Sequence, residues 1–328
     1  MKRFLIVCLL VGALMSCNKN ASYQFYAYPG LGINDTSWTN QNISKGFIDT
    51  IEGLFGIPFY TATFSYNTDE SIRLNDSLQI AFSSNAFADA NTNIPITNGN
   101  IKVDVDVLRN KGDFIKELIA TTSTKYLLAS AGAFYVQISQ NNNPLIITPA
   151  GSFTLKWQDA SPNTNANFFG LIPLANIDSL NTWVANKYGT VSTWDSTNNG
   201  VNKKGYSLSS KITGTWISAN AFLDTVTTTR TRANVLMSSA NFTNKNTLVF
   251  MVFKNQRTVV KLNPDYANRC FYSLNIPIGS AVTLFSISII DNTFYLGNTD
   301  VVVSSANKLS LLPQKATLPD IFSALNNL

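Results

Sequence analysis

The stretch Ile101-Lys102-Val103-Asp104-Val105-Asp106-Val107 decides the fold class. Its odd positions are all apolar and its even positions are all charged, which is the period of two that a β-strand shows. One face of this strand is therefore expected to pack on a core and the other to meet water, as in an antiparallel sheet. Asn98-Gly99 before the stretch and Asn110 to Asp113 after it supply turn residues.

The same alternation, rich in Val, Ile, Thr, Phe and Tyr, recurs on both sides of this stretch. It predicts a first β-sandwich over residues 56–158. Its expected strands are Phe59–Tyr66, Ser77–Phe82, Asn100–Leu108, Ala133–Ser139 and Ser152–Trp157.

Residues 159–205 are rich in Asn, Thr and Ser and show few regular periods, which favours a connector between two domains. Within it, Ser179 to Tyr188 is expected to form a helix capped by Asp178. Trp183 and Trp194 also fall in this connector, and each needs a surface to pack on.

A second block, residues 206–328, predicts another antiparallel sandwich that ends in a short helix. Asp291-Asn292 is expected to form a hairpin turn, and Pro319–Leu328 a helix with Leu318, Phe322 and Leu325 on one side. The expected strands are Leu248–Lys254, Thr258–Leu262, Phe271–Asn275, Ala281–Ile290, Thr293–Leu296, Asp300–Ser304 and Leu309–Leu312. The predicted fold class is thus all-β, with two antiparallel sandwiches.

The chain has 328 residues and no histidine, so catalysis by Ser-His-Asp or Cys-His groups and His-ligated zinc are excluded. No phosphate-binding loop, dinucleotide-binding glycine pattern or nucleophile elbow occurs. We therefore expect a protein that is not an enzyme and has no cofactor. A hydrolase that uses carboxylates alone remains the third alternative.

The first residues predict export and a lipid anchor. Met1-Lys2-Arg3 precedes an apolar run from Phe4 to Met15, as in a signal peptide, and the run is shorter than the roughly 20 residues of a spanning helix. Leu14-Met15-Ser16-Cys17 resembles the bacterial lipobox, in which the chain is cut between Ser16 and Cys17 and the thiol of Cys17 is diacylated. Residues 1–16 are then the signal peptide, and residues 17–55 a tether and an irregular segment.

Charge and cysteine content agree with a membrane-anchored protein that does not bind nucleic acid. Removal of Lys2 and Arg3 leaves 22 basic residues against 19 acidic ones, a net charge of +3. No basic run exceeds Lys203-Lys204, whereas a nucleic-acid groove needs a clustered basic face. Cys270 is the one cysteine left for the folded body, and its strand-like surroundings predict a buried structural thiol.

Several motifs carry a family resemblance. Five segments together are similar to the extracellular β-sandwich of netrin receptors and ankyrins, and more closely to its version in uncharacterised Bacteroidota lipoproteins. They are Leu78–Phe82, Asn85–Phe87, Gly99–Val103, Asp113–Ile115 and Leu128–Phe134. Tyr206–Leu208 with Gly214–Ile217 and Phe222 resembles the start of the second domain of those proteins, although Asn220 stands where an acidic residue is expected. Ile276–Thr283 is similar to a strand entry in transthyretin-like, carboxypeptidase-regulatory domains. The resemblance implies fold and envelope location, and no active site.

A tripeptide of Asp, Ser or Thr, and an apolar residue or Thr resembles the O-glycosylation signal of exported Bacteroidota proteins. The same residues are common in caps and turns, so the alternative is a purely structural role. The candidate acceptors are Thr50, Ser77, Ser179, Ser196 and Thr225.

Two groups are candidates for ligand binding. Asp104 and Asp106 lie two apart on one strand face and are a weak candidate for a calcium site, the alternative being a solvated charged face. Trp183, Trp194 and Tyr188 are candidates for stacking on sugar rings, the alternative being core packing, which we expect for Trp157 and Trp216.

The leading interpretation is a lipid-anchored outer-membrane protein that acts as a non-enzymatic interaction, adhesion or scaffold module. Its expected partners are the membrane through Cys17, and another envelope protein or a glycan. The alternative is a carbohydrate-binding lipoprotein. Because Asn18-Lys19-Asn20 has no acidic residue, the periplasmic face of the membrane is favoured over the cell surface.

Overall fold

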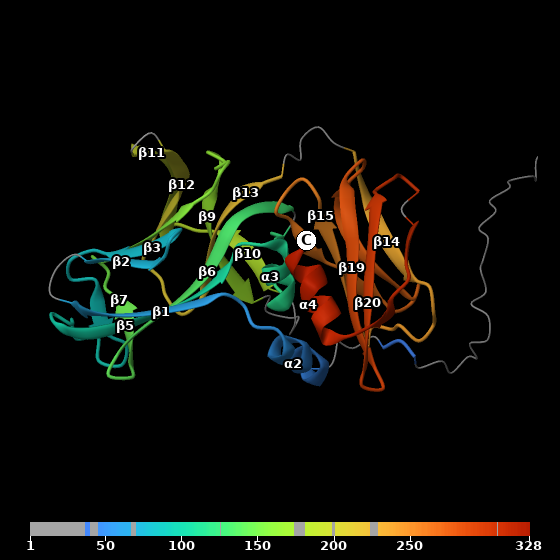
Figure 1. Ribbon diagram of the computed structural model, residues 1–328, viewed down its shortest axis with the longest axis horizontal. Helices are drawn as coiled ribbons and strands as arrows, with labels where there is room; N and C mark the ends of the chain where they lie inside the picture. Colours follow the sequence, from blue (N-terminus) through green and yellow to red (C-terminus); the bar gives the residue numbers. More distant parts are fainter. Residues whose placement is uncertain are drawn as a thin grey trace, which may run out of the picture. The chain divides into compact units, whose positions relative to one another are not determined.

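A computed structural model describes residues 37–39, 45–66, 70–124, 126–173, 181–198, 201–223, 229–306 and 308–328. Ser37–Leu328 form one compact unit. Its strands assemble into two pairs of mainly antiparallel sheets, each pair enclosing an apolar core, which confirms the predicted all-β class (Figure 1). Among the described residues there is no helix with the length and apolar character needed to span a membrane.

The first sandwich consists of sheets A and B. Sheet A has the strand order β1-β5-β6-β13-β9-β10, with β7 paired to β6 and β4 to β7, and sheet B has the order β11-β12-β8-β3-β2. The strands of sheet A are β1 (Phe59–Tyr66), β4 (Phe87–Asp89), β5 (Gly99–Leu108), β6 (Leu128–Gln140), β7 (Asn143–Ile147), β9 (Asn167–Pro173), β10 (Asn181–Ala185) and β13 (Trp216–Phe222). Those of sheet B are β2 (Glu70–Asn75), β3 (Leu78–Phe82), β8 (Phe153–Gln158), β11 (Gly189–Asn198) and β12 (Val201–Ser210).

The alternation in β5 has the predicted consequence. Ile101, Val103 and Val105 are fully buried in the core between sheets A and B. Trp157 fills the same core, as expected, and its indole lies between the rings of Phe134 and Tyr206 at centroid distances of 4.7 and 5.3 Å. The charged positions of β5 consequently face outward.

The prediction of an irregular connector over residues 159–205 is wrong. Strands β9, β10, β11 and β12 occupy most of it and pair within sheets A and B. Residues 206–222, expected to open the second sandwich, also belong to the first, because β12 pairs with β8 and β13 pairs with β6. Whether the two sandwiches fold as independent domains stays a prediction.

The second sandwich consists of sheets C and D. Sheet C has the order β17-β18-β14-β21, in which β14 and β21 are parallel, and sheet D has the order β16-β15-β19-β20-β22. The strands of sheet C are β14 (Arg230–Met237), β17 (Asn263–Asp265), β18 (Cys270–Pro277) and β21 (Lys308–Leu311). Those of sheet D are β15 (Thr247–Phe253), β16 (Val259–Lys261), β19 (Ala281–Ile290), β20 (Thr293–Val302) and β22 (Gln314–Ala316).

Three details of the second block confirm or correct expectations. Asp291 and Asn292 have φ of 48° and 59°, as a tight hairpin turn with two left-handed residues requires, and they join β19 to β20. Thr293–Leu296 and Asp300–Ser304, expected as two strands, are largely one continuous strand, β20. Cys270 is buried as predicted, and burial raises the pKa of its thiol to about 11.

A third apolar cluster, the middle core, joins the two sandwiches. Every residue of β15 is buried: Val249, Met251 and Phe253 face the core of the second sandwich, and Leu248, Phe250 and Val252 face the middle core. Sheet A contributes Leu108, Leu128, Ala133, Phe169, Leu171 and Trp183 from the other side.

Three helices complete the middle core: α2 (Lys45–Leu54), α3 (Lys111–Lys116) and α4 (Leu318–Asn326). Figure 1 shows α3 and α4 between β6 and β10 on one side and β15 and β19 on the other. The predicted terminal helix is thus confirmed as α4, although Ile321 and Leu325 are its most buried residues. Helix α2 corrects the expectation that residues 17–55 are irregular throughout. Burial of its Ile51 in the middle core accounts for its formation.

Candidate functional site

The three predicted sugar-stacking residues lie in different environments. Trp183 is fully buried in the middle core, and its indole N–H donates to the carbonyl of Ala120 at 2.9 Å. It lies on β10, whose pairing with β9 replaces the predicted helix over Ser179–Tyr188 wherever that range is described. Trp183 therefore cannot present a ring face to a sugar, and that prediction is wrong.

Trp194 and Tyr188 are accessible but do not form one site. Trp194 lies on the outer face of sheet B, where the Lys156 Nζ is 4.5 Å from the ring centroid and the indole N–H donates to the Tyr206 carbonyl at 2.9 Å. Tyr188 is 51% exposed just before β11. Trp194 follows Tyr188 by six positions along an extended segment, a span of roughly 20 Å. The predicted binding group is consequently divided into two isolated residues.

Asp104 and Asp106 do share the outer face of sheet A, as predicted. Lys102 Nζ is 2.7 Å from Asp104 Oδ2, so one carboxylate already has a cationic partner. In the described ranges, no three Cys, Asp or Glu residues cluster as metal ligands. Two carboxylates, one of them paired with lysine, fall short of the six to eight oxygens that calcium takes. The pair therefore fits a charged outer face, partly shielded from water, better than a calcium site.

The registers of β1, β5, β6 and β13 place an aromatic row beside these carboxylates. Phe59 is opposite Asp106, Asp106 is opposite Tyr135, and Tyr135 is opposite Trp216. The Tyr135 and Trp216 rings are 5.7 Å apart at 53°, and Gln137 Nε2 donates to the Tyr135 hydroxyl at 3.4 Å. Phe59 is 53% exposed. We call Phe59, Asp106, Tyr135 and Trp216 the aromatic row.

A pocket of about 390 Å³ adjoins the aromatic row on the same face. Among its lining residues are Asp104, Gln137, Ser139, Asn142 and Thr213. Asp104 Oδ1 is buried there and has no hydrogen-bond partner among the described residues. Because a buried acceptor without a donor is costly, a hydrogen bond from an ordered water or from a ligand in the pocket would stabilise this oxygen.

Glu117, at the end of α3, lies close enough to Asp106 for their charges to interact. Burial, together with the charges of Glu52 and Asp106, raises the pKa of Glu117 to about 7. The pKa of Asp106 is raised as well, first by burial and then by Asp104. The edge of the aromatic row therefore has carboxyl groups that hold protons more tightly than usual.

The raised pKa of Glu117 predicts a pH dependence of stability. Because the folded-state pKa lies above the ordinary value of 4.5, the folded protein binds more protons than the unfolded chain between pH 4.5 and 7. The contribution of Glu117 to stability should thus be fully present below this window and be lost as the pH rises through it, by about 1 kcal/mol after allowance for solvent screening. Urea denaturation of wild type and Glu117→Gln at pH 5 and pH 8 measures this, with a flatter profile expected for the variant.

Asp291→Asn is the matched control for this measurement, because Asp291 lies in an exposed hairpin turn. It should keep the pH profile of the wild type. An unchanged decrease in the Glu117→Gln protein would show that Glu117 is not the group responsible.

The predicted modification residues have mixed accessibility. Thr50 is exposed on α2 and donates to the Gly46 carbonyl, and Ser196 is exposed on β11. Ser77 is partly buried and its hydroxyl is bonded to Asn75 and Arg109. Ser16, Cys17, Ser179 and Thr225 lie outside the described residues.

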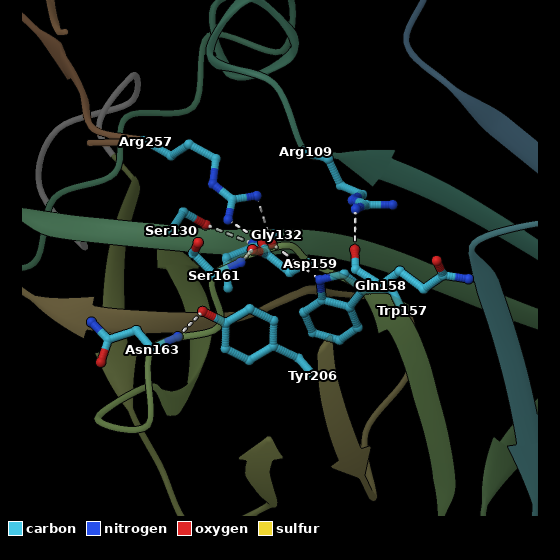
Figure 2. Close-up of polar contacts among 11 residues, drawn as sticks. Arg109, Ser130, Gly132, Trp157, Gln158, Asp159, Ser161, Asn163, Tyr206 and Arg257 are labelled. Atoms are coloured by element: carbon cyan, nitrogen blue, oxygen red, sulfur yellow. Dashed lines mark hydrogen bonds and ion pairs between the residues drawn. The ribbon is translucent and has the colours of Figure 1, made fainter. Parts of the chain in front are cut away.

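A polar cluster that the sequence did not reveal lies where β8 ends. Arg257, from the turn between β15 and β16, forms an ion pair with Asp159. Arg109 Nη2 donates to the Gln158 carbonyl at 2.6 Å, and the Trp157 indole donates to the Ala131 carbonyl at 3.2 Å. Figure 2 shows both arginines pointing toward this strand end, with Tyr206 beside Trp157.

Neither the aromatic row nor the arginine cluster can be found from spacing in the sequence. Both depend on which strands pair and in what register, since Arg109 and Arg257 belong to different sandwiches. For the aromatic row, a signal does exist: the charged positions of β5 define an outer face, whose neighbours become known once the strand order is known.

Comparisons with models of protein families, with curated proteins and with solved structures find no match to this chain. The resemblance to netrin-receptor, ankyrin and transthyretin-like domains therefore stays a prediction beyond the all-β class.

Proposed function

We propose that this chain is a lipid-anchored cell-envelope protein that acts as a non-enzymatic interaction module through the outer face of sheet A. The observation that carries the proposal is the buried Asp104 Oδ1, an acceptor without a donor, beside the aromatic row and a pocket of about 390 Å³. Strands β5, β6 and β13, which hold Asp104, Asp106, Tyr135 and Trp216, are paired on both sides, so this part of the face is preorganised for binding. The lipobox-like Leu14–Cys17 supports the anchor.

A glycan is the ligand that the chemistry of this face favours. Aromatic faces stack on sugar rings, while carboxylate and amide groups exchange hydrogen bonds with sugar hydroxyls. Tyr135 supplies the first kind of contact, and Asp104 and Gln137 the second. Trp216 packs partly against the middle core, as expected, and its ring lies 5.7 Å from that of Tyr135. This second candidate, a carbohydrate-binding lipoprotein, thus uses different residues from those the sequence suggested.

Substitution at Tyr135 tests the glycan candidate. Tyr135→Ala removes a half-buried ring of the row, and we expect glycan-array binding to weaken by roughly three- to tenfold, the equivalent of an aromatic pair. Trp194→Ala on the outer face of sheet B is the matched control and should bind as the wild type does. If Trp194→Ala alone weakens binding, the site lies on sheet B, and if no glycan binds, the glycan candidate fails.

The non-enzymatic part of the proposal is tested on the same material. Glu117 and Asp106 are the carboxylates whose raised pKa values suit acid–base work. We expect no release of reducing sugar or free amines from a panel of glycans and peptides. Hydrolysis that Glu117→Gln or Asp106→Asn abolishes would replace the interaction module with a carboxylate-based hydrolase.

The side of the membrane is a further part of the proposal. Because Asn18-Lys19-Asn20 contains no acidic residue, we favour the periplasmic face of the outer membrane. Protease shaving of intact cells should leave the protein whole, and release of fragments from unpermeabilised cells would place it on the surface.

A further inference from the structure

Two arginines from different sandwiches line one pocket at the end of β8, away from the outer face of sheet A. Arg109 directly follows β5, and Arg257 lies between β15 and β16. The pocket measures about 240 Å³ and includes Tyr60, Asn75 and Asn110 in its wall. Figure 2 shows the two guanidinium groups approaching the same strand end.

The two guanidinium groups differ in whether a carboxylate neutralises their charge directly. Arg257 forms its ion pair with Asp159, whose side chain is 9% exposed. Arg109 donates to uncharged oxygens, the Gln158 carbonyl at 2.6 Å and the Ser77 hydroxyl at 3.2 Å. A guanidinium has five N–H groups, so among the described residues three of those on Arg109 remain for a ligand.

The pocket wall also contains a carboxylate, Asp113, which would oppose an anion. Its Oδ2 accepts from the backbone N–H of Asn110 at 2.9 Å and of Arg109 at 3.3 Å, and its Oδ1 lies 3.6 Å from Lys116 Nζ. The cluster contains three cations, Arg109, Arg257 and Lys116, and two carboxylates, Asp113 and Asp159, so its net charge is +1. Asp159 attracts Arg109 as well, but its direct ion pair is with Arg257.

We propose that this pocket binds the oxyanion group of a small acid, a carboxylate or a phosphate, with Arg109 as its principal donor. The planar guanidinium matches both groups and can hold either through two parallel hydrogen bonds. The volume of about 240 Å³ is smaller than the roughly 300 to 1,000 Å³ of pockets for drug-sized ligands, so the ligand is small. This site is independent of the interaction face proposed above.

Two further observations support an anion at this position. Asn75 accepts from both the backbone N–H and the hydroxyl of Ser77 through its Oδ1, at 2.7 and 3.1 Å, which leaves its amide nitrogen as a donor. The pKa of Arg109 is lowered by burial and then by the charge of Arg257, effects that Asp159 partly offsets, and a bound anion would favour the charged guanidinium in the same way as Asp159 does.

Calorimetric titration of the full chain carrying Cys17→Ser tests the proposal. Sodium phosphate and sodium acetate are the probes, and sodium chloride at equal ionic strength measures screening alone. We expect saturable binding of at least one oxyanion, and the tighter of the two identifies the chemical class. Arg109→Gln should weaken it by at least about tenfold, since a hydrogen bond to a charged group contributes that much.

Asn110→Asp provides a second variant that preserves the fold. Asn110 is exposed at the start of α3, where aspartate caps a helix as well as asparagine does, but the new charge would repel an anion. Arg73→Gln on β2 and Asn91→Asp in an exposed turn are the matched controls and should bind as the wild type does. The proposal is overturned if neither oxyanion binds beyond the chloride effect, or if Asn110→Asp and a folded Arg109→Gln protein both bind with wild-type affinity.

Discussion

Cys17→Ser is expected to move the protein from the membrane to the aqueous phase. Only a thiol at this position can form the thioether to diacylglycerol, and each acyl chain contributes about 0.8 kcal/mol per buried CH₂ group. Two or three chains anchor stably where one does not, whereas a globular body of net charge +3 has no comparable affinity for a bilayer. Metabolic palmitate labelling and partition into a detergent phase should both be lost.

The matched control is Cys8→Ser, which changes a cysteine within the signal peptide and should keep the label. The Cys17→Ser body should retain its strand-rich circular dichroism and its Tm, because Ser37–Leu328 form a compact unit without residue 17. Persistent palmitate labelling of Cys17→Ser would reject the lipoprotein assignment.

Trp183→Ala is expected to destabilise the fold by about 3 to 5 kcal/mol, the usual cost of removing a fully buried tryptophan. The indole fills the middle core, to which both sandwiches and all three described helices contribute. Its removal also leaves the Ala120 carbonyl without the 2.9 Å hydrogen bond. Urea denaturation followed by circular dichroism measures the change as a lower midpoint.

Trp194→Ala is the control, since this tryptophan lies partly exposed on sheet B beneath Lys156. We expect it to cost about 1 kcal/mol or less. Equal losses for the two variants would contradict the burial of Trp183. A loss confined to one of two separate transitions would show that the sandwiches unfold independently, as the predicted domain division implies.

The strands predicted correctly are those whose pattern is decided locally. Strands β1, β5 and β19 have the expected bounds to within a residue. Their alternation, or their run of β-branched apolar residues, is compatible with an extended strand and not with a helix. Of the missed strands β9 to β12, β11 and β12 are rich in Asn, Ser and Thr, whereas β9 is largely apolar. Strand β9 pairs with β10 and β11 with β12, and the two pairs join the sandwich through β13 and β8, which composition does not show.

The helix expected over Ser179–Tyr188 was also wrong because long-range pairing, which the local sequence does not show, decides the structure there. Its sequence permits a helix, but pairing of β10 with β9 and burial of Trp183 favour a strand. Helix α2 was missed because its apolar face is buried only once the middle core has formed.

The candidate site was predictable in part. Alternation in β5 places Asp104 and Asp106 on one outward face, and the registers confirm it. Tyr135 and Trp216 join them only through pairing with β6 and β13, and the pocket residues Arg109 and Arg257 meet only because the two sandwiches share a core. Such juxtapositions depend on long-range topology, and periodicity does not encode it.

Mass spectrometry of the amino-terminal peptide from the native protein tests the anchor most directly, and the localisation depends on that anchor. After digestion with trypsin, we expect the peptide Cys17-Asn18-Lys19 with a diacylglyceryl group on the sulfur and an acyl chain on the new amino terminus. An unmodified Cys17, or a mature chain that begins at any other residue, would contradict it.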